Sequence, residues 1–123
     1  MVTIESISCV ELWLGMNLAE ETIRNILTDK KLSAIKMALE KDHAIDCLFL
    51  LYLDKGRWKN AKAFMKELNL TLSDGTFRSR MIELESLGLA ESMAIDPLKK
   101  YYVKTELGKK IAKFLLDFFS DLG

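Results

Sequence analysis

Apolar residues recur at helical spacing along most of the chain, and this spacing changes only after residue 89. In residues 1–16 the pattern fits either a helix or a strand, and we expect a helix there. Asn17, followed three residues later by Glu20, has the spacing of a helix cap with its reciprocal acidic partner. We therefore expect a helix to open at Asn17, and helical spacing then continues through Ile35 toward Lys41.

Two more helices are expected in the next stretch of the chain. Asp42 is a good cap for the first of them, which is apolar nearly all round and is stopped by the sequence Asp54-Lys55-Gly56. A helix without a polar face belongs in the middle of a core. The second begins near Asn60 and divides into an apolar side and a basic side. Its apolar residues are Ala61, Phe64, Met65 and Leu68, and its basic residues are Lys59, Lys62 and Lys66.

A third helix and a hairpin follow. Ser73 can cap the helix, which we expect over about residues 74–87 because Gly88 ends it. Its apolar stripe consists of Phe77, Met81 and Leu84. From there the period changes to that of strands, with a turn at Asp96-Pro97-Leu98-Lys99. We expect a hairpin with a basic tip over about residues 90–104.

Thr105 can cap a long last helix whose apolar stripe is wider than one small domain usually covers. We expect this stripe to form a dimer interface. The candidate dimerisation residues are Leu107, Ile111, Phe114, Leu115, Phe118, Phe119 and Leu122. The predicted fold is therefore mainly α with a small β-hairpin wing, an α+β winged helix-turn-helix with additional N-terminal helices and a long C-terminal helix. We expect one domain over residues 1–123, made of an N-terminal extension (1–41), a core (42–104) and a terminal helix (105–123).

Charge is segregated along the chain. The 18 basic and 18 acidic residues cancel overall, so any contact with nucleic acid must come from local charge. Residues 55–104 hold ten basic and six acidic side chains, whereas residues 42–54 hold three aspartates and no lysine or arginine. The basic excess thus falls on the two later helices and the hairpin.

The remaining chemistry-bearing residues do not form a catalytic pattern. Cys9 and Cys47 lack the spacing of a redox or zinc motif, and the one histidine, His43, completes no usual zinc site with them. We expect buried thiols, with a redox pair as the open alternative. No nucleophile with a base, metal cluster or phosphate-binding glycine loop is present in the sequence. We therefore expect no enzyme, no metal and no cofactor.

The order of basic helix, short turn, helix and basic hairpin is what a reader of the DNA grooves needs. With the stripe of the third helix inward, Gly75, Thr76, Ser79 and Glu83 point outward and Arg78 and Arg80 lie on the flanks. Arginine can contact guanine with two hydrogen bonds, and hydroxyls can donate to bases or phosphates, whereas lysines hold phosphates. The candidate DNA-binding residues are Lys59, Lys62, Lys66, Ser73, Thr76, Arg78, Ser79, Arg80, Lys99 and Lys100.

Two phrases of the sequence resemble the winged-helix transcriptional regulators of the HxlR, PadR and MarR type. They are Leu84-Glu85-Ser86-Leu87-Gly88-Leu89 and Tyr102-Val103-Lys104-Thr105-Glu106-Leu107-Gly108. In those families the first phrase ends a recognition helix and the second opens a dimerisation helix. The resemblance covers about residues 42–120, and Lys104 departs from it, because the families usually carry leucine there. It implies a homodimer that presents two recognition helices to a pseudo-palindromic site in double-stranded DNA.

A different function for the same fold stays open. Neutral overall charge, together with Glu83 and Glu85 on the later turns of the third helix, also fits a winged-helix module for protein association without direct DNA binding. The longest apolar run is too short to span a bilayer, and no signal peptide is evident, so we expect a cytoplasmic protein without a membrane partner. The sequence names no small-molecule effector.

Overall fold

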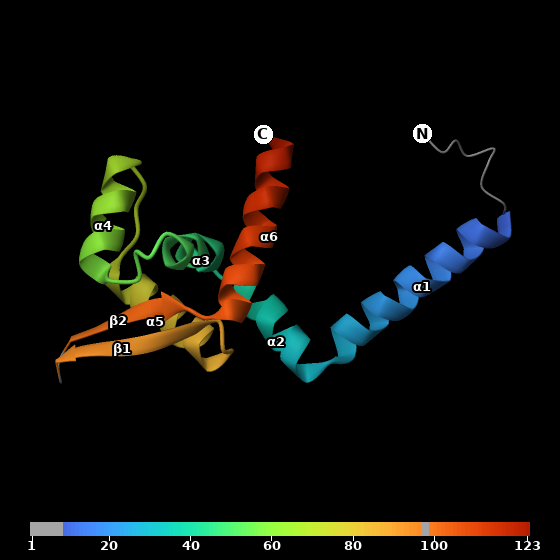
Figure 1. The fold of residues 1–123 in the computed structure, drawn as a ribbon, viewed down its shortest axis with the longest axis horizontal. Coiled ribbons are helices and arrows are strands. Elements are labelled where there is room, and N and C mark those ends of the chain that lie inside the picture. Colours follow the sequence, from blue (N-terminus) through green and yellow to red (C-terminus); the bar gives the residue numbers. More distant parts are fainter. Residues whose placement is uncertain (1–8, 97–98) are drawn as a thin grey trace. The chain divides into compact units, whose positions relative to one another are not determined.

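The fold is mainly helical with one antiparallel hairpin, as the sequence predicts (Figure 1). The computed structural model describes residues 9–96 and 99–123. Within α2 the chain divides into two compact units, of which the second begins at Met37. The second unit holds all the candidate DNA-binding residues.

The first unit is built from α1 (Cys9–Thr28) and the beginning of α2 (Lys30–Leu39). The helix expected in residues 1–16 is confirmed from Cys9 onward, and residues 1–8 lie outside the described part of the chain. The helix start expected at Asn17 is wrong, because α1 runs through Asn17 without a break. Good helix formers on both sides of Asn17 allow the intrahelical hydrogen bonds to continue past a local capping pair. Asp29 is the cap in this region, since its Oδ1 accepts a hydrogen bond from the Leu32 N–H at 2.8 Å.

The second unit is centred on α3 (Ala44–Tyr52), which contacts α5, α6 and the second strand of the hairpin. Leu48 and Leu51 of α3 are fully buried, as expected for a helix that is apolar on nearly every side. The cap predicted at Asp42 is wrong. His43 precedes the helix instead, in the left-handed conformation (φ 63°), and its side chain makes no capping hydrogen bond. The His43 ring is held by Asp46, at 2.9 Å between Nδ1 and Oδ2.

The predicted helix pair and hairpin are present. The helices are α4 (Trp58–Glu67) and α5 (Asp74–Ser86), and the strands are β1 (Ala90–Asp96) and β2 (Lys99–Lys104). Helix α4 begins two residues before the predicted Asn60. The hairpin pairs Ala90 with Lys104 and Asp96 with Lys99, with an irregularity between Ala94 and Asp96. The turn residues 97 and 98 lie outside the described part of the chain.

The core of this unit joins α3 and α5. Phe77, Met81 and Leu84 of α5 are all buried, which confirms the predicted stripe. Helix α5 also packs against β1, and the Phe77 ring lies against Trp58 of α4, with 5.3 Å between the ring centroids. The recognition helix predicted from the sequence is therefore in contact with α3, α4 and the hairpin.

Two glycines allow the close approaches that complete the unit. A Cβ at Gly56 would overlap the Tyr102 carbonyl, and the Gly56 carbonyl accepts a hydrogen bond from the Tyr102 N–H at 3.0 Å. A Cβ at Gly108 would overlap the Leu89 carbonyl. Gly108 lies in the first turn of α6 (Glu106–Leu122), whose predicted cap is confirmed: the Thr105 Oγ1 accepts from the Gly108 N–H at 3.1 Å. These contacts fix the hairpin and α6 against the helical core.

Candidate nucleic-acid interface

The outer face of α5 consists of Gly75, Ser79, Ile82 and Ser86, all of them exposed. This face lies opposite the buried Phe77 stripe, because successive helix residues turn by about 100°. Three of its four residues are small, so the helix backbone can come close to a binding partner. Sequence reasoning missed Ile82, whose side chain is 57% exposed. The signal for it was an apolar residue outside the core stripe of the helix.

The predicted cap at Ser73 is present at the start of α5, and two hydroxyls predicted for the site form hydrogen bonds within it. The Ser73 Oγ accepts from the Thr76 N–H at 3.1 Å and donates to the Thr76 Oγ1 at 2.9 Å. Both residues therefore stabilise the first turn of the helix. Ser79 is exposed on the outer face.

Arg78 lies on the side of α5 that faces the hairpin. Its side chain is 68% exposed, and its Nε donates to the Asp74 carboxylate at 2.8 Å. Burial and the charge of Glu85 raise the pKa of Tyr102 in β2, and the positive charge of Arg78 opposes this rise. Arg78 is thus close enough to the hairpin for their charges to interact.

The hairpin is attached to the last turns of α5. The Glu85 carboxylate accepts a hydrogen bond from the Ser92 N–H of β1 at 2.8 Å. This hydrogen bonding lowers the pKa of the Glu85 carboxyl, and the positive charge of Lys100 on β2 lowers it further. Lys100 and Arg78 therefore lie at the same junction between helix and hairpin, where Lys100 acts on the Glu85 carboxylate and Arg78 acts on Tyr102.

Arg80 lies on the opposite flank of α5 and is turned into the protein. Its side chain is only 18% exposed, and its Nη1 donates to Glu83 at 2.7 Å. Lys41 also pairs with Glu83, at 3.1 Å. The DNA contact predicted for Arg80 stays a prediction, but this position favours a structural role. Glu83, expected to point outward, is engaged by both cations.

The predicted lysines on α4 and at the hairpin tip are all exposed. They are Lys59, Lys62, Lys66, Lys99 and Lys100. At the tip, the Lys99 N–H donates to the Asp96 Oδ1 at 2.9 Å, which orders the start of β2. Exposed lysines of this kind suit contacts with phosphates.

Arg57 is a further basic residue that was not predicted for the site. It precedes α4, is exposed, and its guanidinium lies over the Tyr101 ring of β2, 5.5 Å from the ring centroid. The arginine thereby connects the beginning of α4 with the hairpin. Its position could be found only from the fold, because Arg57 and Tyr101 are far apart in the sequence.

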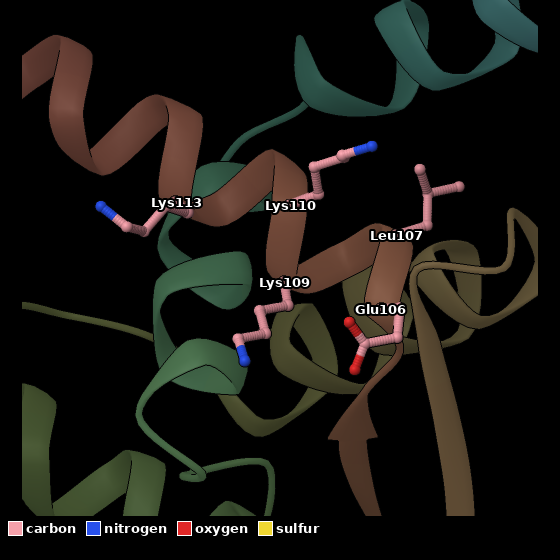
Figure 2. Close-up of a pocket in the computed structure, with 5 residues that line it drawn as sticks. All are labelled: Glu106, Leu107, Lys109, Lys110 and Lys113. Atoms are coloured by element: carbon pink, nitrogen blue, oxygen red, sulfur yellow. The ribbon is translucent and has the colours of Figure 1, made fainter.

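The predicted dimerisation residues divide into two groups. Leu107, Ile111 and Leu115 are half-buried, whereas Phe114, Phe118, Phe119 and Leu122 are exposed. A cavity of about 550 Å³ opens along the first turns of α6 (Figure 2). Because all five lining residues belong to that one helix, the cavity is a surface hollow, and nothing about its lining indicates a catalytic site. Its lining residues are Glu106, Leu107, Lys109, Lys110 and Lys113.

Comparison with known proteins adds no assignment. No protein-family model matches the chain, and no curated protein or solved structure is detectably similar to it. In the described residues, no helix is long and apolar enough to cross a membrane.

Proposed function

We propose that this chain is a cytoplasmic transcriptional regulator that binds double-stranded DNA in a sequence-specific manner. Helix α5 enters the major groove with its outer face, and the hairpin follows the backbone or the minor groove. The observation that carries the proposal is the junction of α5 and the hairpin, where the charge of Lys100 acts on Glu85 and the charges of Glu85 and Arg78 act on Tyr102. A base-contacting arginine and a phosphate-contacting lysine would there approach one segment of DNA together.

The outer face of α5 supports the same docking. Gly75, Ser79 and Ser86 let the helix backbone approach the floor of the groove, and the exposed Ile82 suits apolar contact with a thymine methyl group. The exposed lysines of α4, with Arg57 at its beginning, would hold the adjoining phosphates. These contacts contribute affinity with little sequence information.

A second candidate function is protein association through the same surface. Ile82 is the observation that favours it, because an exposed isoleucine among small neutral residues also suits an apolar protein partner. Neutral net charge is compatible with this function. The two candidates differ in their salt dependence, since only binding to phosphates releases condensed counterions.

The test is binding of the full chain to DNA upstream of its own gene, compared with random duplex, at two salt concentrations. The first proposal expects preferential binding that weakens steeply as salt rises. Absence of binding to either DNA at both salt concentrations would refute it. Capture of a protein at high salt that is lost on Ile82→Glu would then favour the second function.

Two arginines of the chain give a matched pair of variants for this test. Arg78 and Arg24 are both exposed, and each pairs with a carboxylate four residues earlier, at 2.8 Å to Asp74 and 2.9 Å to Glu20. Arg78→Ala should weaken specific binding by about 1–3 kcal/mol. Arg24→Ala makes the same change of charge on α1 and should leave specific binding unaltered. If both variants lose the same binding free energy, Arg78 contributes only through the net charge of the protein.

A further inference from the structure

Helix α6 carries two parallel rows of apolar residues, and only one of them is used within the second unit. The first row consists of Gly108, Ala112, Leu115 and Phe119. Gly108 and Ala112 are buried, and the Phe119 ring meets Phe49 of α3 edge to face, at 6.4 Å between centroids. This row is the face that α6 packs against α3.

The second row is spaced at intervals of four, three, four and four residues. It consists of Leu107, Ile111, Phe114, Phe118 and Leu122. This is the spacing by which two helices pair along a common seam. The first two side chains are half-buried, and the last three are 70%, 50% and 69% exposed. In the part of the chain that the structure describes, the C-terminal half of this row is left largely uncovered.

The charges beside the second row are unequally distributed along α6. Lys109, Lys110 and Lys113 lie in the first half of the helix, and Asp117 and Asp121 lie in the second. Apart from Glu106, this order opposes the helix dipole, which favours acidic residues near the beginning of a helix and basic residues near its end. A neighbouring helix of the same sequence that runs in the opposite direction would compensate this distribution.

Two of these charges lack partners among the described residues and flank the uncovered row. Lys113 is paired with Asp117 within the helix, at 3.0 Å. Lys110 and Asp121 make no ion pair or hydrogen bond in the described structure. Figure 2 shows Lys110 pointing to the same side of α6 as Leu107, the first residue of the row, whereas Lys109 and Lys113 point to the other side. Asp121 lies eleven residues after Lys110, or about three helical turns, and so falls on the same flank.

We propose that two copies of this chain pair through α6 in antiparallel orientation. In this pair Phe114 of each copy lies against Phe118 of the other, and Lys110 of each lies against Asp121 of the other. The two contacts agree in register. Lys110 lies four residues before Phe114 and Asp121 lies three residues after Phe118, so the charges differ in height by one residue, about 1.5 Å.

The antiparallel direction follows from the same charges. Flanks of the same kind meet in an antiparallel helix pair, which places Lys110 of one copy beside Asp121 of the other. A parallel pair in register would place Lys110 level with Lys110, and Asp121 level with Asp121. The antiparallel pair also has the twofold symmetry that is usual for a dimer of identical chains. The pairing can be measured in the absence of DNA, so its test is separate from the test of DNA binding.

The first test is the molar mass of the full chain by light scattering across a wide range of concentration. The wild type should be a dimer, and Phe114→Glu should raise the dimer dissociation constant by at least about a hundredfold. Circular dichroism of the variant checks that its helices are retained. A monomeric wild type, or a Phe114→Glu variant that dimerises as tightly as the wild type, would overturn the pairing.

The second test addresses direction and register through charge reversal. Lys110→Glu alone and Asp121→Lys alone should each weaken the dimer about tenfold, and the double reversal should recover most of the loss. Lys109→Glu makes the same change of charge on the other side of α6 and should leave the dimer unaltered. If the double reversal is as weak as the single ones, the proposed register is wrong.

Discussion

Arg80 donates from Nη1 to the Glu83 carboxylate at 2.7 Å, one turn further along α5. Lys41, which precedes α3, reaches the same carboxylate at 3.1 Å. Glu83 thus connects α5 with the segment that leads into α3. These ion pairs hold one flank of the predicted recognition helix against the core and so oppose rotation of the helix about its axis.

Arg80→Ala should lower the free energy of unfolding by about 1–2 kcal/mol, because Glu83 loses a charged donor and the mostly buried arginine stem loses its packing. The buried Arg80 Nε has no partner among the described residues, which reduces the loss. Arg78→Ala, at an exposed position on the same helix, should change stability by less than about 0.5 kcal/mol. Urea denaturation measures both values. Equal stability of wild type and Arg80→Ala would contradict the structural role.

The two arginines also show where sequence reasoning reached its limit on the site. Helical spacing placed Arg78 and Arg80 on opposite flanks of α5 but could not say what each flank meets. The hairpin lies beside Arg78, and Lys41 with Glu83 lies beside Arg80. Lys41 and the hairpin come from other parts of the chain, so no local pattern indicates them, whereas Glu83 lies three residues after Arg80 and is a local helix partner.

The fold itself was largely predictable where local chemistry and packing agree. Ser73 and Thr105 cap their helices as expected, and Gly88 ends α5 with a φ of 79°. The errors occurred at two predicted caps, Asn17 and Asp42. Asp42 has a good capping side chain, yet the main chain turns at His43, and the helix begins after it.

The stability of the protein should fall in acid partly through Glu83. Desolvation raises the pKa of its carboxyl, but the hydrogen bond from Lys41 and the charges of Arg80 and Lys41 outweigh this, so the pKa lies below its ordinary value of 4.5. A lowered folded-state pKa contributes stability above the unfolded-state value, and this contribution is lost as pH falls below about 4.5 toward the folded-state pKa. Urea denaturation at neutral pH and below pH 4.5 should therefore show a smaller acid loss in Glu83→Gln than in wild type. Glu67→Gln, an exposed change on α4, should retain the full loss.

The Cys47 thiol should be unreactive in the folded protein. Burial raises its pKa to about 12, and the charge of Asp46 raises it in the same direction, so almost no thiolate exists at neutral pH. A Cys9→Ser variant leaves Cys47 as the one reporting thiol. A disulfide reagent should modify this variant only after denaturant is added. Rapid modification without denaturant would contradict the burial and reopen a redox role.

Lys104 takes a structural position at the end of β2. Its Nζ donates to the Asp54 carboxylate at 2.8 Å and to the Tyr52 carbonyl at 3.2 Å, and it lies over the Tyr52 ring. Tyr52 is the last residue of α3, so the ammonium satisfies a carbonyl at the negative end of that helix. The end of β2 is thereby tied to the end of α3.

Lys104→Met should lower the free energy of unfolding by about 1–2 kcal/mol, because methionine retains most of the stem but neither hydrogen bond. Asp54→Ala should cost less than about 1 kcal/mol, since the carboxylate is 77% exposed. The double variant should lose less than the sum of the two, because both single changes break the same ion pair. Urea denaturation of the four chains measures this coupling, and additive losses would show that the ion pair contributes nothing. The Tyr52 carbonyl would then account for whatever Lys104→Met alone loses.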